Sequence, residues 1–472
     1  MSQSLVIRGA QVLDGTGAPE RIADVRVEGG LVTHIDPLVP AADEEVDGRG
    51  LVLAPGFIDV YTHDDTALIT APLMPQKVSQ GVTSIVTGLC GYSPAPLRAV
   101  RQLPAEYLGV LSNDAISFET FSGFLDAIAA ARPAVNYLPL VGHSSLRLSA
   151  MQDTGRAATK AEIAVMGLLL DEAMQAGAAG LSSGLAYSMA QATETQELIT
   201  LSRRIKACSG LYVTHLRDEA GGMLDATREA LTIGREAGVG VVFSHHKAIG
   251  EANYGKTAES LAMIDRAGLT QKVALDVYPY TYSSTVLDRA RAGRGGRIVV
   301  TRSGARPDLA GRDLSDIASE LELDLAGTAD ALHPAGALYF CMDDGDVDRV
   351  LCHPRCMIGS DGLPYDPHPH PRLWGTFPRV LGHYVRDRGL LSLADAVHRM
   401  TGLPARVFGL KGRGVIAPGH HADLVLFDSE EIADGATPSA PTTPASGIRQ
   451  VWIGGKSPSI GTGQRLVSRH ET

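Results

Sequence analysis

Six side chains that could bind a metal ion or move a proton each follow a short apolar run in this 472-residue sequence. Imidazole and thiolate groups suit zinc, and a carboxylate beside a bound cation can act as a general acid or base. Together they point to metal-assisted hydrolysis, provided that the fold brings them to one place. The six residues are His63, Cys90, His143, His215, His245 and Asp361.

His215 and His245 are the strongest candidates for metal ligands. Each ends a run that otherwise reads as buried, YVT and VVFS, where an imidazole without a partner is costly. Cys90 alone reads as a small buried hydrophobe, but with the two imidazoles it completes a set of three ligands. Three protein ligands leave one coordination place for water, as catalytic zinc requires. The neighbouring His246 faces the other side of the expected strand, and we expect a structural role for it.

Asp361 is the candidate general acid and base. It follows the apolar run MIGS and precedes Gly362. A carboxylate there would take a proton from a metal-activated water and pass it to the leaving nitrogen. The alternative is a structural aspartate that caps a turn.

The elements that must position these residues are eight apolar runs separated by helical patterns. Val, Ile and Leu dominate the runs, which is typical of parallel strands covered on both faces. Eight such units predict a (β/α)8 barrel of the TIM type, which gathers the carboxyl ends of its strands at one mouth. An open doubly wound sheet is the alternative, but no G-x-G-x-x-G follows the first run. The runs are GFIDVYTH, TSIVTGLC, VNYLPLVGHSS, AGLSSGLAY, YVTHLRDE, VVFSHHK, VALDVYPY and MIGSDG.

Both ends of the chain predict short strands broken by turns, so we expect them to form one small β-sandwich domain around the barrel. The expected domains are residues 1–55 and 412–472 for the sandwich and 56–411 for the barrel. An insertion is expected at about 285–345, because the last two barrel runs lie too far apart for one helix. Segments of this size at a barrel mouth often form lids or substrate walls.

Composition excludes several classes of protein. A net charge of −11 argues against a nucleic-acid partner. No targeting segment opens the sequence, and no run of about 18 apolar residues could span a membrane. The five cysteines are scattered, as a reducing compartment tolerates. We therefore expect a cytoplasmic protein that acts on a small molecule, with no obligate protein partner.

With these residues in place, the sequence resembles the amidohydrolase superfamily and, within it, the N-acyl-D-amino-acid deacylases. The resemblance runs essentially from end to end, and the long block after residue 358 is its most specific part. The motifs are PGFID-x-x-THDD at 55–65, SQGVTSIVTGLCG at 79–91, LVGHSSLR at 140–147, GLSSGLAY at 180–187, THLRDE at 214–219, SHHK at 244–247, LDVYPY at 275–280 and IGSDGLPYDPHPHPRLWGTFPRVLGHY at 358–384.

The resemblance implies a zinc ion bound tightly by Cys90, His215 and His245, with Asp361 as the catalytic acid and base. It also implies that four residues hold the carboxylate and backbone of an N-acyl amino acid, and Arg suits a carboxylate because it can bind both oxygens. Surface, core or turn duty is the alternative for three of them, Lys247, Tyr278 and Ser284. We place His143, at the end of a strand, with the substrate-binding group. The four implied residues are Lys247, Tyr278, Ser284 and Arg372.

One departure from the family pattern concerns the metal site. The family has His-x-His at the end of the first strand, whereas this sequence has Tyr61 and His63. A phenol, with a reference pKa of about 10, is a poor zinc ligand at neutral pH. The departure calls into question a second metal place beside Asp361, to which His63 would belong. Leu89 also replaces an Asn of the family pattern next to Cys90.

Three functions remain open at this point. The first is hydrolysis of N-acyl-D-amino acids to a carboxylate and a free D-amino acid. The second, motivated by Tyr61, is a weakened or non-catalytic homologue that binds acyl amino acids. The third is another amidohydrolase reaction, such as opening a cyclic amide.

Overall fold

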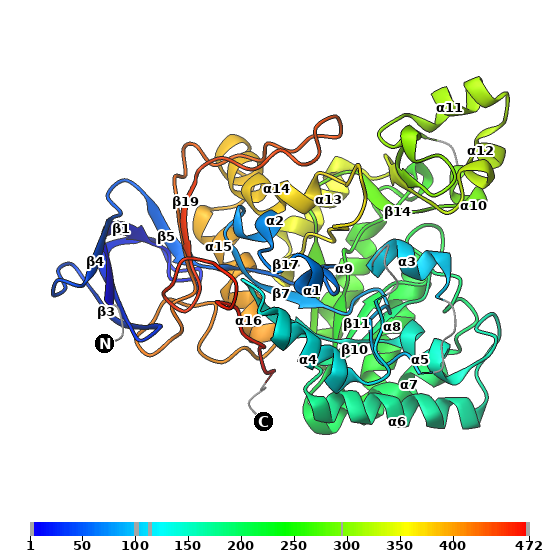
Figure 1. Cartoon of the computed structure of the whole chain (residues 1–472), viewed down its shortest axis with the longest axis horizontal. Helices are drawn as coiled ribbons and strands as arrows, with labels where there is room; N and C mark the ends of the chain where they lie inside the picture. Colours follow the sequence, from blue (N-terminus) through cyan, green and yellow to red (C-terminus); the bar gives the residue numbers. More distant parts are fainter. Residues whose placement is uncertain (1–3, 99–102, 112–115, 294–295, 469–472) are drawn as a thin grey trace.

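The computed structural model describes residues 4–98, 103–111, 116–293 and 296–468. It contains a barrel, a small sheet at one side and an insertion at the other (Figure 1). Small parts of the expected domain and insertion ranges, residues 1–3, 99–102, 112–115, 294–295 and 469–472, lie outside the described residues. The exact domain boundaries stay a prediction.

The barrel has eight parallel strands in the described part of the chain, and one of them is split by Leu140 into β8 and β9. It closes between the first and last strands, where Thr62 bridges Gly362 and the Asp361 amide donates to the Tyr61 carbonyl at 2.8 Å. The (β/α)8 architecture is thereby confirmed. The strands are β6 (Phe57–Asp59), β7 (Val82–Thr87), β8 (Asn136–Pro139), β9 (Val141–Gly142), β10 (Gly180–Gly184), β11 (Leu211–His215), β12 (Gly240–Phe243), β13 (Val273–Val277) and β17 (Cys356–Ile358).

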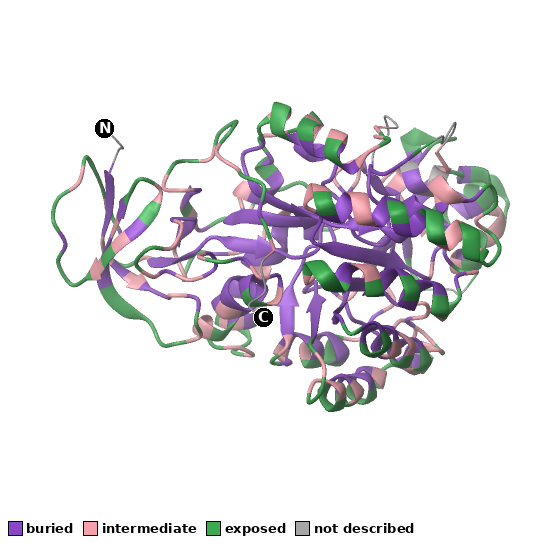
Figure 2. Cartoon of the chain, turned by 90° about the horizontal axis from the view of Figure 1, so that it is seen from below, coloured by how far each residue is buried: buried purple, intermediate pink, exposed green. Residues whose placement is uncertain are grey.

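The larger helices pack around the barrel, most of them with a buried inner face and an exposed outer face (Figure 2), whereas the helix at 372–379 has no exposed residue. Helix α6 shows how the sequence sets the bounds. It starts at a capping box made by Thr159 and Glu162 and ends at Gly177, whose φ of 115° suits glycine. These helices are α4 (Phe121–Ala131), α6 (Lys160–Ala176), α7 (Thr195–Ile205), α8 (Met223–Ala237), α9 (Lys256–Ala267), α13 (Asp344–Cys352), α14 (Arg372–Arg379) with its continuation η4 (Val380–Asp387), and α15 (Leu393–Met400).

Shorter helices and turns connect the larger elements. They are α1 (Ala67–Thr70), α2 (Pro75–Val78), α3 (Ala105–Leu111), α5 (His143–Ala150), η1 (Lys206–Cys208), η2 (Glu251–Asn253) and α16 (Gly402–Val407). No helix in the described ranges is both long enough and apolar enough to cross a membrane.

The insertion between β13 and β17 is a small antiparallel sheet with its own apolar core. Its strands run in the order β14 (Ser283–Leu287), β16 (Ala335–Tyr339) and β15 (Ile298–Ser303). Helices α10 (Arg289–Ala292), α11 (Leu314–Leu321) and α12 (Leu325–Leu332) accompany it, with the turn η3 (Pro307–Leu309). Leu287, Val300, Ile317 and Ala337 belong to a buried cluster separate from the barrel core. The insertion is therefore a compact unit beside the barrel, at the upper right of Figure 1.

Strands from both ends of the chain share one sheet in the order β19-β18-β5-β1-β2-β3, with β4 beside β1. Their inward side chains enclose a cluster that includes Ile7, Val25, Leu424 and Trp452. In Figure 1 the first strands and β19 meet at the left. The expectation that the two ends meet is confirmed. The strands are β1 (Ser4–Val12), β2 (Arg21–Glu28), β3 (Leu31–Asp36), β4 (Glu44–Asp47), β5 (Val52–Pro55), β18 (Leu424–Phe427) and β19 (Ile448–Trp452).

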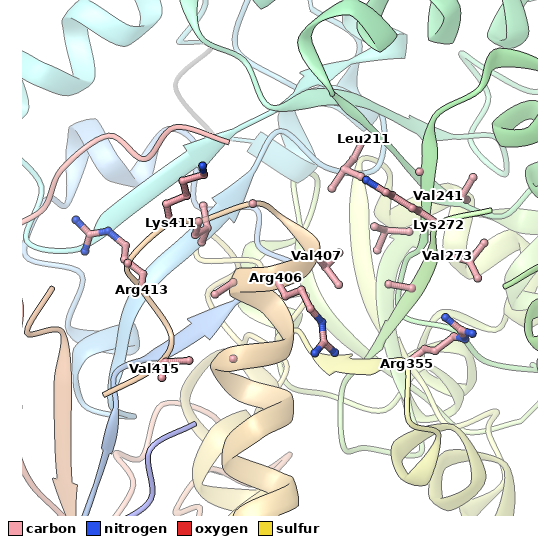
Figure 3. A pocket seen from close by; sticks show the side chains of 18 of the residues that line it. Leu211, Val241, Lys272, Val273, Arg355, Arg406, Val407, Lys411, Arg413 and Val415 are labelled. Atoms are coloured by element: carbon pink, nitrogen blue, oxygen red, sulfur yellow. The ribbon is translucent and has the colours of Figure 1, made fainter. Parts of the chain in front are cut away.

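The barrel has a cavity at each end. A cavity of about 610 Å³ lies where β11, β12 and β13 begin and is lined by Leu211, Val241 and Val273 together with cations such as Lys272 and Arg406 (Figure 3). The residues with candidate chemistry follow the opposite ends of the strands. The cavity at that opposite end is therefore the candidate active site.

Candidate metal and catalytic site

A cavity of about 440 Å³ opens at the carboxyl ends of the barrel strands. His215, His245, Lys247, Tyr278 and Asp361 line it from the barrel side. The insertion supplies the facing wall. Of the insertion residues that line the cavity, the sequence analysis identified only Ser284. The others include Thr285, Asp288, Arg291, Arg297, Tyr339 and Phe340.

Cys90, His215 and His245 meet at one point behind this cavity. The Cys90 sulfur lies 3.5 Å from Nδ1 of His215 and 4.0 Å from Nε2 of His245. One candidate ligand atom from each residue lies within 4.8 Å of the other two. All three residues are buried, with at most 8% of each residue exposed. The strand ends thus converge on a three-ligand arrangement that suits a single tetrahedral ion.

The protonation states of His215, His245 and Cys90 are compatible with binding a metal ion. Burial lowers the pKa of His215 to about 3 and also lowers the pKa of His245, so both imidazoles are neutral and can coordinate. Burial raises the pKa of the Cys90 thiol, with a further rise from Asp361. A buried thiol of this kind becomes a ligand when a metal cation displaces its proton.

The backbone at the site adopts an uncommon conformation. Cys90, His245 and Asp361 have positive φ angles of 53°, 35° and 50°. Non-glycine residues avoid this region, and such strain concentrates at functional sites. Each of the three residues lies two or three positions after the end of a barrel strand. The left-handed turn there therefore sets the direction in which the side chain leaves the strand end.

Asp361 is held by two cationic or potentially cationic partners. Its Oδ1 lies 3.2 Å from Nε2 of His63, and its Oδ2 lies 2.9 Å from Arg372. Burial alone would raise the pKa of Asp361, but the charge of Arg372 and the hydrogen bond with His63 outweigh it, and the pKa lies below the usual range. The carboxylate is therefore ionised and oriented beside the three ligands.

Glu219 is a site residue that sequence reasoning missed. Its carboxylate accepts from Lys247 at 2.7 Å and lies 3.2 Å from Nδ1 of His245. It also lies 3.6 Å from Nε2 of His215. The available signal was its spacing, four residues after His215 in THLRDE. Glu219 therefore contacts both candidate imidazole ligands and the Lys247 ammonium at the cavity wall.

Lys247, Tyr278 and Arg372 form a cationic wall around an aromatic ring. The Lys247 ammonium lies 5.7 Å from the Tyr278 ring centre, and the Arg372 guanidinium lies 4.5 Å from it. Ser284 lines the cavity, and its buried hydroxyl has no hydrogen-bond partner among the described residues. Four of the five expected substrate residues therefore lie together.

His143 lies apart from this group. Its side chain is fully buried, and its Nε2 contacts Glu197 at 2.7 Å, next to the Arg147–Glu197 ion pair at 2.8 Å. His143 is not among the residues that line the cavity. The structure therefore gives it a buried ion-pair partner and does not bring it to the other substrate candidates. His246 likewise has a partner outside the site, Ser260 at 2.8 Å.

Comparison with known proteins defines the class of this chain. The amidohydrolase family model matches residues 44–292 and 334–457, and the unmatched stretch between them holds β15, α11 and α12. The chain belongs to the amidohydrolase family. The expected family resemblance is thereby confirmed.

Individual relatives cover nearly the whole chain. An N-acyl-D-aspartate deacylase from Alcaligenes xylosoxydans xylosoxydans is 49% identical over 96% of this chain and 91% of that protein. An N-acyl-D-glutamate deacylase from Bordetella bronchiseptica, in complex with zinc and a phosphonate mimic of the tetrahedral intermediate, matches with a TM-score of 0.96 and 43% identity, over 99% of this chain and 100% of that chain.

A D-aminoacylase structure matches with a TM-score of 0.95 and 45% identity, over 98% of this chain and 99% of that chain. That enzyme has a binuclear metal centre in which one metal activates and the second attenuates. Metal-dependent hydrolysis of linear N-acyl amino acids is thus the chemistry of proteins with this fold and this degree of similarity.

Proposed function

We propose that this protein hydrolyses N-acyl-D-amino acids to a carboxylate and a free D-amino acid, using one tightly bound zinc ion held by Cys90, His215 and His245. The observation that carries the proposal is the meeting of these three side chains within 4.8 Å of one another. Asp361 lies beside them at the wall of a cavity large enough for a small ligand. The relatives that cover nearly the full length are deacylases of this class.

The ionised Asp361 carries the proton transfers. A zinc ion at this site, when bound, supplies Lewis acidity that activates a water molecule and polarises the amide carbonyl. Asp361 accepts the proton from the water and then donates it to the nitrogen as the C–N bond breaks. The carbonyl carbon leaves in the carboxylate, and the nitrogen leaves as the amine of the amino acid. His63 and Arg372 hold the Asp361 carboxylate in place through contacts at 3.2 Å and 2.9 Å.

The cationic wall fits the anionic end of the substrate. Lys247 and Arg372 place two positive charges within 5.7 Å and 4.5 Å of the Tyr278 ring centre, and Ser284 offers a hydroxyl without a partner among the described residues. A carboxylate bound there would be fixed by charge and hydrogen bonds, which holds the amide in one orientation. We also propose that the protein acts in the cytoplasm on small molecules, without a required protein partner.

The test combines metal analysis with a substrate panel. The purified protein should contain zinc, lose activity after chelation and regain it with added zinc. It should cleave N-acetyl-D-amino acids and leave the L-enantiomers largely uncut. A protein that holds zinc but cleaves neither enantiomer would favour the non-catalytic alternative, and one that opens only cyclic amides would favour the third.

Asp361→Asn tests the role of the carboxylate. The variant should keep its zinc and lose activity by a factor of about 10²–10⁴, because the proton carrier is gone while the metal ligands remain. Hydrolysis rates and metal content should be measured on the same preparation. Asp288→Asn, which changes a carboxylate on the facing wall of the same cavity, serves as the matched control. Wild-type rates in Asp361→Asn would remove Asp361 from the mechanism.

A further inference from the structure

Tyr61 lies at the metal site although its side chain is a poor ligand. Its hydroxyl is 2.7 Å from the Cys90 sulfur, a hydrogen-bond distance, and its side chain is fully buried. The ring packs edge-on against His245, with centres 4.9 Å apart, and against His63, with centres 5.7 Å apart. Tyr61 therefore contacts two candidate zinc ligands, Cys90 and His245, and also His63, the residue expected at a second metal place.

The Tyr61 ring has little freedom to leave this position. A Cβ atom on Gly359 would come within 2.6 Å of the Tyr61 Cβ, so the backbone that directly follows strand β17 packs against this residue. The Tyr61 carbonyl also accepts the Asp361 amide at 2.8 Å. Backbone and side chain are thus fixed by the same contacts that close the barrel.

The second metal place lacks a sufficient set of ligands. His63 and Asp361 are 3.2 Å apart and could share an ion, but two protein ligands fall short of the three that zinc sites use. Within the described residues, the only group of three candidate His, Cys, Asp or Glu ligands is Cys90, His215 and His245. The Cys90 sulfur, the nearest further donor to Tyr61 that is named above, already faces the Tyr61 hydroxyl at 2.7 Å.

We propose that Tyr61 makes this a single-metal site: it excludes a second ion and instead donates a hydrogen bond to the Cys90 thiolate. In the D-aminoacylase relative, a second metal attenuates activity. This chain should escape that attenuation, because the place is filled by a neutral phenol. His63 then serves as a positioning residue for Asp361. The inference rests on the proposed zinc site and adds the metal count and the role of Tyr61.

The metal count tests the exclusion directly. Metal-free protein is dialysed against increasing zinc, and the bound metal is measured by plasma mass spectrometry. The wild type should saturate at one zinc per chain, Tyr61→Phe at one, and Tyr61→His at two. Wild-type saturation at two would overturn the proposal. So would saturation of Tyr61→His at one, provided that its circular dichroism and melting temperature match the wild type.

The hydrogen bond is tested with cobalt in place of zinc. A hydrogen bond stabilises the thiolate lone pairs, so its loss in Tyr61→Phe should move the thiolate-to-cobalt charge-transfer band to longer wavelength. Tyr107→Phe is the matched control, since Tyr107 is an equally buried tyrosine whose hydroxyl donates to the Ser93 carbonyl instead. An unchanged band in Tyr61→Phe, or an equal shift in the control, would overturn the hydrogen-bond role.

Activity at excess zinc completes the test. The wild-type rate should stay level as zinc rises above one equivalent, whereas the rate of Tyr61→His should fall as its second site fills. A wild-type rate that falls together with uptake of a second zinc would contradict the proposal. The metal count and the cobalt band require no substrate. A protein that binds one zinc but cleaves no N-acyl-D-amino acid would thus overturn the proposed function and leave the role of Tyr61 standing.

Discussion

At the scale of single residues, Glu219 connects the two halves of the site. Its carboxylate contacts Lys247 on the substrate wall and His245 in the ligand group. Burial alone would raise its pKa, but the charge of Lys247 and the hydrogen bond with His245 outweigh burial and hold the pKa below its ordinary value. An ionised partner of this kind fixes the orientation of a metal-binding imidazole.

Glu219→Gln should therefore weaken zinc binding by about 10–100-fold, as losses of outer-shell partners typically do. Competition with a chromophoric chelator measures the affinity. Glu259→Gln, an exposed glutamate on α9, is the control and should bind zinc like the wild type. Equal affinities for the two variants would show that Glu219 does not orient the ligands.

His370 fixes the backbone of Arg372. Its Nδ1 accepts the Arg372 amide at 2.9 Å, and its Nε2 donates to the Tyr282 carbonyl at 2.9 Å, which is the pattern of a neutral imidazole. Burial, reinforced by the charge of Arg372, keeps the pKa of His370 well below its ordinary value. The folded protein thus excludes a proton that the unfolded chain binds.

The free energy of unfolding should accordingly fall as pH drops below about 6.5, with His370 contributing up to about 1.4 kcal/mol per pH unit. Urea unfolding of the metal-free protein between about pH 7 and pH 5 measures this slope. His370→Asn keeps an acceptor but does not titrate, so its profile should be flatter. The exposed His34→Asn should reproduce the wild-type slope, and parallel profiles for all three proteins would refute the assignment.

Much of the site could be predicted from sequence because barrel geometry is restrictive. Cys90, His215 and His245 each follow an apolar strand, and parallel strand ends must meet at one mouth. His143 also follows a strand, but its side chain pairs with Glu197 on α7. Its position after a strand could not reveal this distant partner. Glu219 was missed because it lies beyond the strand, in a loop whose path depends on tertiary contacts.

At the scale of elements, an aromatic stack joins the insertion to the segment between β17 and α14, which contains His370. Tyr282 stacks on His370 with ring centres 4.3 Å apart and on Phe340 with centres 4.7 Å apart. The guanidinium of Arg297 covers the far side of Phe340 at 4.6 Å. Since His370 holds the Arg372 amide, the position of the insertion is linked to that of Arg372.

Phe340→Ala should raise KM up to about tenfold with a smaller effect on kcat, because it removes a stacking contribution of about 0.5–1.5 kcal/mol from the wall around Arg372. Steady-state kinetics with the best substrate of the panel separate the two constants. Leu323→Ala, at a half-exposed position elsewhere in the insertion, should leave both unchanged. A fall in kcat without a change in KM would show that the stack does not act through substrate binding.

The existence of an insertion followed from chain length, but its form did not. The stretch between β13 and β17 exceeds what one helix needs, which is visible in the sequence. Its antiparallel pairing, β14 with β16 before β15, joins strands that are out of sequence order. Such pairing depends on nonlocal contacts, among them those of Leu287 and Ala337, that no local pattern reveals.

At the scale of the whole molecule, stability depends on the sheet that both ends build. Trp452 on β19 is 1% exposed and packs with Ile7 and Leu424 in the same cluster. Trp452→Ala should lower the free energy of unfolding by about 3–5 kcal/mol through cavity formation. Urea denaturation measures the loss, and Ile460→Ala, at a position 52% exposed, is the control. A small loss would show that the sheet unfolds independently of the barrel.

The pairing of β5 with both β1 and β18 has a consequence for biosynthesis. The partner of one edge of β5 is encoded about 370 residues later, beyond the entire barrel. At about 5–20 residues per second, translation of that interval lasts on the order of 20–75 s. Throughout it the nascent chain carries an unpaired strand edge, a surface prone to wrong association. The edge is covered only when β18, among the last strands to be made, pairs with β5.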